Sequence, residues 1–285
     1  MQVELFMVIG YVLMSSAIGV FAAGSLAQLA MRADGNTEVQ PFVRASYVAS
    51  TALMVGGAAC TLLHLGNIGY FYGILTNFGS WLTRESWLVG GFAAMCVAAS
   101  VLAVRGGARK PLAIVGVLGM IAGTLLLFSM SMAYMTAHAI PSWNDMGVLV
   151  TNLAEMLALG SAAALLLVSF FGSDDRARAG ALRKGLSIAA IVASVGALLA
   201  FVSYFATLTL LPDTSVVMNA SNTGFAVAKM ALLAIAVAAA IALERKARTA
   251  VSLPLVATFA VCVLASDALS RILHFTLATH IPLVF

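Results

Sequence analysis

Charged residues are scarce in this sequence: Asp, Glu, Lys and Arg together make up 9% of its 285 residues. Soluble domains usually contain about 25% of them. Apolar residues account for 62% of the chain, so a soluble fold would leave much apolar surface in water. The shortage of charge excludes an ordinary soluble domain and indicates a protein surrounded by lipid.

Cysteine is also scarce, and none of the spacings between cysteines is typical of a metal site or a redox pair. The three cysteines each lie inside an apolar stretch: Cys60, Cys96 and Cys262. We therefore interpret them as small buried residues rather than ligands, because free cysteine behaves as a small apolar side chain in protein interiors.

The apolar residues form long runs, each long enough to cross a hydrocarbon layer about 30 Å thick as a helix. The ten-residue alternating segments of a membrane barrel are not visible. The sequence thus predicts an all-α integral membrane protein, with eight helices packed as two bundles in a single transmembrane domain over residues 1–285. The predicted spans are 5–31, 43–65, 86–104, 112–137, 146–171, 184–211, 225–243 and 252–273.

Basic residues concentrate in alternate connectors between these spans. Twelve of the 15 Lys and Arg residues lie there: Arg32, Arg44, Arg105, Arg109, Lys110, Arg176, Arg178, Arg183, Lys184, Arg245, Lys246 and Arg248. The connectors that contain Pro141 and Pro212 have none. The positive-inside rule then places the basic connectors in the cytoplasm and both termini outside it, in the inner membrane. The net charge of +4 reflects this topology, and no nucleic-acid partner is expected.

The histidines all lie near the outer ends of the predicted spans. They are His64, His138, His274 and His280. A chain of haems across the membrane would need histidine ligands near both faces. We therefore expect no haem and no metal site in this chain.

Some charged residues fall outside the basic connectors and are candidate site residues, because ionisable groups within a span usually face a protein interior or a partner charge. They are Arg84, Glu85, Glu155, Lys229, Asp267 and Arg271. Asp267 and Arg271 are four residues apart, a spacing at which opposite charges on one helix can meet. This pair is either structural or functional.

The connector from Gly66 to Arg84 is rich in aromatic residues: Tyr70, Phe71, Tyr72, Phe78 and Trp81. Such residues are typical of a membrane-interface belt. Beside His64 and Glu85 they could also enclose a flat aromatic ligand such as a quinone. Quinol oxidation releases two electrons and two protons, and an imidazole beside a carboxylate can hold the hydroxyl and accept a proton.

Several short motifs resemble the membrane-anchor subunit of dimethyl sulfoxide reductases. They follow one another along the eight spans: Leu63-His64-Leu65-Gly66 and then Glu85, Tyr134 nine residues before the Trp of Pro141-Ser142-Trp143, Lys229 before an apolar run, and Asp267-Ala268-Leu269-Ser270-Arg271. The resemblance implies a subunit that oxidises menaquinol from the quinone pool near the outer face. It would pass electrons to an iron–sulfur subunit, which serves a molybdopterin catalytic subunit.

The resemblance also implies roles for individual residues. His64 would hold and deprotonate the quinol, and Glu85 would accept or relay a proton. Tyr72, Tyr134 and Arg271 would complete the quinol site. Residues that would dock the partner or form structural ion pairs are Arg84, Lys229, Asp267 and Arg271. The iron–sulfur clusters and the molybdopterin would lie in the partner subunits only.

The sequence departs from the family pattern at three positions. Asp267 is shorter than the usual acid, Lys229 replaces an Arg, and His274 lies where an aromatic residue is expected. Since an anchor subunit does not touch the terminal substrate, the acceptor that the complex reduces is not predicted.

Two other functions remain open at the level of sequence. A transporter would place charged residues near the middle of the membrane, and Glu155 is the residue that favours it. A passive anchor would need no titratable cluster. A variant of the quinol-oxidising function runs the electrons in the reverse direction, so that the subunit would reduce quinone.

Overall fold

The computed structural model of the chain describes residues 2–33, 41–64, 69, 71–106, 109–171, 176–211, 219–247 and 252–277. The described residues form nine helices and no strand. These are α1 (Gln2–Ala33), α2 (Pro41–His64), α3 (Phe71–Thr76), α4 (Trp81–Val104), α5 (Arg109–Met135), α6 (Met146–Phe171), α7 (Arg176–Thr209), α8 (Ala220–Lys246) and α9 (Leu253–Thr276). In the described part of the chain, 8 helices are long and apolar enough to cross a membrane. The predicted all-α membrane fold is confirmed.

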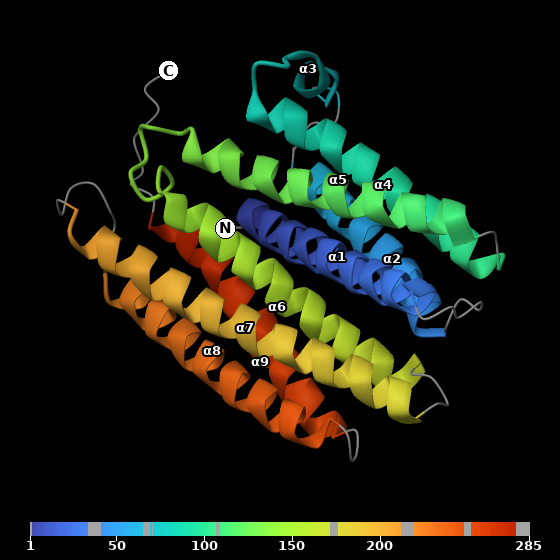
Figure 1. Cartoon of the computed structure of the whole chain (residues 1–285). Helices are drawn as coiled ribbons and strands as arrows, with labels where there is room; N and C mark the ends of the chain where they lie inside the picture. The colour runs from blue at the N-terminus through green and yellow to red at the C-terminus, as the bar shows by residue number, and fades with distance from the viewer. Residues whose placement is uncertain are drawn as a thin grey trace.

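The long helices pack as two bundles (Figure 1). The first contains α1, α2, α4 and α5, drawn in blue to green, and the second contains α6, α7, α8 and α9, drawn in yellow-green to red. Within each bundle, helices that follow one another along the chain lie side by side, because short connectors favour antiparallel neighbours. The short helix α3 lies at the end of the first bundle, next to the start of α4 (Figure 1).

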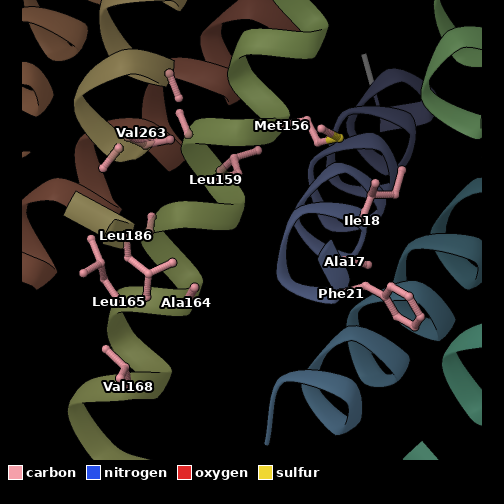
Figure 2. Close-up of a cluster of buried hydrophobic side chains, with 14 of the residues drawn as sticks. Ala17, Ile18, Phe21, Met156, Leu159, Ala164, Leu165, Val168, Leu186 and Val263 are labelled. Atoms are coloured by element: carbon pink, nitrogen blue, oxygen red, sulfur yellow. The ribbon is translucent and has the colours of Figure 1, made fainter. Parts of the chain in front are cut away.

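Helices α1 and α6 join the two bundles. Where they cross, Gly19 of α1 lies against Gly160 of α6, so closely that a Cβ on either residue would overlap the backbone of the other. Around this crossing the side chains of Ile18 and Met156 are buried, and Figure 2 shows them on the facing helices. Lipid tails are as apolar as the helix surfaces, so close backbone approach at small residues is what stabilises such a contact.

We predict that Gly160→Val destabilises the protein, because the added side chain has no room against Gly19. Overpacking of this kind costs about 1–3 kcal/mol. The measurement is the thermal unfolding temperature in detergent, which should fall. Gly90→Val is the matched control, since a Cβ at Gly90 meets no atom of the described residues within 4 Å. Equal unfolding temperatures for the two variants would contradict the role given to this crossing.

Several helices extend beyond their predicted spans; α7, for example, begins at Arg176 rather than at 184. Two of these differences concern site residues. Helix α4 begins at Trp81 rather than at 86, with Ser80 as N-cap accepting the N–H of Leu82. Glu85 therefore lies inside the second turn of the helix and not in the connector. Helix α9 continues to Thr276, so His274 belongs to the helix rather than following it. The predicted residues Pro212 and His280 fall outside the described residues.

The antiparallel order brings the basic helix ends together at one end of the molecule. That end contains the start of α2 with Arg44, the end of α4 with Arg105, the start of α5 with Lys110 and the end of α8 with Lys246. The ends of α5 and α9 and the starts of α4, α6 and α8 lie at the opposite end, here called the acidic end because Glu85 lies there.

Candidate functional site

A buried hydrogen-bonded chain lies near the acidic end of the first bundle. It joins Tyr11 of α1, Glu85 of α4 and Tyr134 of α5. The hydroxyl of Tyr11 donates to Oε1 of Glu85 at 3.1 Å, and the hydroxyl of Tyr134 donates to that of Tyr11 at 3.3 Å. Glu85 is buried, and its second oxygen, Oε2, has no hydrogen-bond partner in the described part of the chain. Of the two carboxyl oxygens of Glu85, Oε1 therefore has a hydrogen-bond partner in the described part of the chain and Oε2 has none.

Arg271 of α9, in the second bundle, lies next to this series of hydrogen bonds. Its Nη2 donates to Oδ1 of Asp267 at 3.3 Å, and its Nη1 donates to Oδ1 of Asn152 at 2.9 Å. Asn152, on α6, in turn donates to the hydroxyl of Ser131 on α5 at 2.9 Å. On its other side the guanidinium lies 5.6 Å from the centre of the Tyr11 ring. The cation is therefore held from three sides at the junction of the bundles.

A second buried ion pair lies deeper in the second bundle. The ammonium of Lys229 on α8 pairs with Oε1 of Glu155 on α6, and it also donates to the backbone carbonyl of Ser266 on α9 at 3.4 Å. Lys229 is the tenth residue of its helix, which places it about 14 Å from the helix start at the rise of an α-helix. Both side chains are buried, so their charges are balanced only within the protein.

The two ion pairs are adjacent, since Ser266, whose carbonyl Lys229 contacts, precedes Asp267 in the chain. Together they contain two cations and two carboxylates. Buried charges are tolerated when they are paired and hydrogen-bonded. This arrangement leaves the second bundle neutral at this depth and explains why four ionisable residues can lie inside apolar helices.

An aromatic layer covers the cluster at the acidic end. The ring of Trp143 stacks on that of His274, with centroids 5.2 Å apart and planes inclined by 7°. The indole N–H of Trp143 donates to the carbonyl of His274 at 2.6 Å. The ring of Tyr134 meets His274 edge-on, with centroids 4.4 Å apart. Trp143, which belongs to the connector between α5 and α6, thereby ties that connector to α9.

The other predicted site residues lie outside this cluster. His64 is the last residue of α2, and its side chain falls outside what the structure describes. Tyr72 on α3 is 77% exposed, and no hydrogen bond or ring contact joins it to Glu85 among the described residues. Arg84 is exposed and lies over the ring of Trp81 at 4.4 Å, with its Nε donating to the carbonyl of Phe78.

Several members of the cluster were not predicted from sequence, among them Tyr11 and Asn152. Tyr11 and Asn152 each lie within an apolar run. Both are uncharged, so a search for charged residues within the spans does not find them. The signal that would have found them is the cost of burying a polar tip in an apolar helix without a hydrogen bond. Among the described residues, no three or more His, Cys, Asp and Glu side chains gather as metal ligands would.

A comparison with protein families gives one match over nearly the whole chain: the DMSO reductase anchor subunit (DmsC) matches residues 1–277. The chain belongs to that family. A comparison with curated proteins found no match. The family match confirms the resemblance inferred from the short motifs and establishes the chain as a multi-pass membrane anchor of a DMSO reductase complex.

Glu85 has a buried carboxylate oxygen without a hydrogen-bond partner among the described residues, which is unusual for a subunit that serves only as an anchor. An anchor that only held other subunits to the membrane would need no unpaired carboxylate oxygen inside its first bundle, because such a group is costly to bury. In this anchor subunit, Glu85 carries such an oxygen and lies beside two tyrosine hydroxyls.

Proposed function

We propose that this anchor subunit oxidises menaquinol at the cluster around Glu85 and passes the electrons to an iron–sulfur subunit. That partner serves a molybdopterin catalytic subunit, where the terminal acceptor is reduced. The observation that carries the proposal is the buried Glu85 carboxylate, whose Oε1 accepts a hydrogen bond from Tyr11 while Oε2 has no partner among the described residues.

The chemistry follows from this geometry. A quinol hydroxyl at Oε2 gives its proton to the carboxylate as the electrons leave, so Glu85 acts as a general base. Tyr11 holds the carboxylate in one orientation, and Tyr134 extends the hydrogen-bonded chain from it. Arg271 faces Tyr11 from the second bundle, and its positive charge favours the anionic forms through which a quinol passes as it loses protons.

His64 enters the proposal through the family resemblance, as the residue that holds the quinol and takes its first proton. Its place at the end of α2 fits this role, since α2 ends at the acidic end of the molecule, where α4 begins and carries Glu85 in its second turn. Tyr72 on the neighbouring helix α3 would line the entrance from the lipid. Arg84, which is exposed in the first turn of α4, would contact the iron–sulfur subunit.

The orientation of the subunit follows from its charges. The end that holds Arg44, Arg105, Lys110 and Lys246 would face the cytoplasm by the positive-inside rule. The acidic end and both termini would then lie on the outer side of the inner membrane. The quinol would be oxidised there, and its protons would be released on that side.

The test is a binding titration of the intact complex with a fluorescent quinol-site inhibitor. Glu85→Gln should weaken binding about 10-fold to 100-fold, since a hydrogen bond to a charged group contributes about 1.5–3 kcal/mol. His64→Ala should weaken it as well. Quinol-dependent reduction by the complex should fall in parallel.

Glu244→Gln is the matched control, because Glu244 is a partly exposed acid at the basic end, paired with Lys184. It should leave binding unchanged. Full inhibitor binding in Glu85→Gln, in a complex that retains its partner subunits, would reject the quinol site and favour a passive anchor. Loss of both the partners and the inhibitor from the wild-type preparation would reject the electron-transfer function altogether.

A further inference from the structure

A closed series of polar contacts, here called the junction network, lies where the two bundles meet. Its members are Tyr11 of α1, Ser131 and Tyr134 of α5, Asn152 of α6 and Arg271 of α9. Asn152 donates to Ser131 and accepts from Arg271, at 2.9 Å in each case. Arg271 faces the ring of Tyr11, and Tyr134 donates to the Tyr11 hydroxyl. Because Ser131 and Tyr134 are about one turn apart on α5, the network returns to the helix on which it begins.

The hydroxyl of Ser131 fixes the direction of these hydrogen bonds. Ser131 donates its one hydroxyl proton to the carbonyl of Leu127, at 3.1 Å. Its oxygen can therefore only accept from Asn152, so the amide NH2 of Asn152 points toward α5. The amide oxygen Oδ1 then points toward Arg271, whose guanidinium has donors and no acceptor. Ser131 and Arg271 thus require the same orientation of the Asn152 amide.

These hydrogen bonds are shielded from bulk water. Ser131 is fully buried, and Asn152 and Arg271 are 6% and 7% exposed. Hydrogen bonds in a protein interior are electrostatically stronger than in water, and a buried group that loses its partner is costly. An Asn152 amide turned the other way would place its NH2 against the guanidinium and leave both groups without an acceptor. The amide is therefore held in one orientation at both of its ends.

The ion pair with Asp267 does not by itself place Arg271 relative to the first bundle. Asp267 lies four residues earlier on the same helix, so the pair belongs to α9 alone. Among the described residues, Asn152 is the one hydrogen-bond partner of the guanidinium that lies on another helix. Asn152 is itself bonded to Ser131 of the first bundle. The position of the cation relative to that bundle therefore depends on these two uncharged side chains.

We propose that Asn152 and Ser131 are positioning residues, which hold the Arg271 guanidinium against Tyr11 and thereby set the affinity of the quinol site. Neither residue contacts the quinol. This inference rests on the proposed quinol oxidation, in which Arg271 faces Tyr11 and Tyr11 holds the carboxylate of Glu85. Without Asn152 the cation remains in the second bundle but is no longer held beside Tyr11. Its charge then contributes less to binding at Glu85.

Two substitutions in the intact complex test this role by titration with the fluorescent quinol-site inhibitor. Asn152→Ala removes the bond to the guanidinium and should weaken binding about tenfold, the effect of one lost hydrogen bond to a charged group. Ser131→Ala keeps Asn152 but frees its amide to turn, and it should weaken binding about threefold. Ser161→Ala is the matched control and should bind as wild type. Ser161 of α6 also donates to a carbonyl four residues earlier, that of Leu157, and among the described residues no hydrogen bond joins it to Asn152 or Arg271.

A second genetic background separates positioning from general structural support. The double variant Arg271→Met with Asp267→Asn has no guanidinium to position. Adding Asn152→Ala or Ser131→Ala to it should leave the affinity for the inhibitor unchanged, because both residues act only through Arg271. A structural role would weaken binding in both backgrounds, since effects of independent sites add. Thermal unfolding of the same preparations establishes that each variant is folded.

The outcomes distinguish failure of the positioning role from failure of the quinol site. Wild-type affinity in both Asn152→Ala and Ser131→Ala overturns the positioning role, and so does an equal loss with and without Arg271. If Asn152→Ala does not assemble, Ser131→Ala decides by the same two criteria. Weak binding in Glu85→Gln beside wild-type affinity in the positioning variants rejects the positioning role alone. Full binding in Glu85→Gln rejects the quinol site, and the positioning role with it.

Discussion

Replacing Lys229 with methionine should strongly destabilise this anchor subunit. The ammonium of Lys229 is the cation paired with Glu155, and both side chains are buried. Methionine fills a similar volume but leaves the carboxylate of Glu155 without a counter-charge inside the second bundle. Breaking a buried ion pair in this way costs about 3–5 kcal/mol. The measurement is the thermal unfolding temperature of the purified subunit in detergent, together with its yield in membranes.

The double variant Lys229→Met with Glu155→Gln distinguishes charge balance from packing. Because it removes both charges, most of the lost stability should return, whereas a loss due to packing alone would persist or grow. Lys184→Met is the matched control, since Lys184 pairs with Glu244 at 3.6 Å where both side chains are partly exposed. Such pairs contribute about 0–1 kcal/mol, so this change should have little effect. Wild-type stability in Lys229→Met would refute the electrostatic account.

The eight helices could be predicted because the lipid environment dictates length and composition for each of them. An apolar run of about 20 residues has few alternatives to a membrane-spanning helix. The prediction was less accurate at the start of α4, because Arg84 and Glu85 interrupt the apolar pattern and suggest a connector. The structure begins the helix at Trp81, where Ser80 caps it. Helix caps are local hydrogen bonds that an average over apolar residues does not detect.

The candidate site was predictable only where its contacts are local. Asp267 and Arg271 are four residues apart on one helix, and the structure places them in an ion pair. By contrast, Lys229 and Glu155 are 74 residues apart, as are Tyr11 and Glu85. These partners depend on which helices pack together and how each is rotated. A single sequence contains no local signal for either.

The structure also changes how the charged residues are understood. From the sequence, Lys229 was interpreted as a docking residue or as part of a structural ion pair. It lies fully buried on α8 and pairs with Glu155, so its charge is used inside the bundle. Charges deep in a span would also suit a transporter, but the family match identifies an anchor subunit. Because Lys229 and Glu155 balance each other, Arg271 is the cation that pairs with Asp267, and it also faces Tyr11 of the first bundle.

Replacing Arg271 with methionine should abolish quinol oxidation and destabilise the fold. Arg271 is the group that donates to Asp267 and Asn152 and faces the ring of Tyr11. Without it, Asp267 is a buried carboxylate with no cation, at a cost of about 3–5 kcal/mol. The proposed quinol site would also lose the positive charge beside Tyr11. Unfolding temperature and inhibitor binding, measured on the same preparation, report the two effects.

The double variant Arg271→Met with Asp267→Asn separates the structural effect from the functional one. Removing the carboxylate charge should restore much of the stability, because no unpaired ion remains. Inhibitor binding should stay weaker by about 10-fold to 100-fold, since a charge-assisted interaction of about 1.5–3 kcal/mol is still missing. Recovery of binding together with stability would show that Arg271 only balances Asp267. Persistent loss of binding in a stable protein would place the guanidinium within reach of the quinol, at the junction where the second bundle meets Tyr11 of the first.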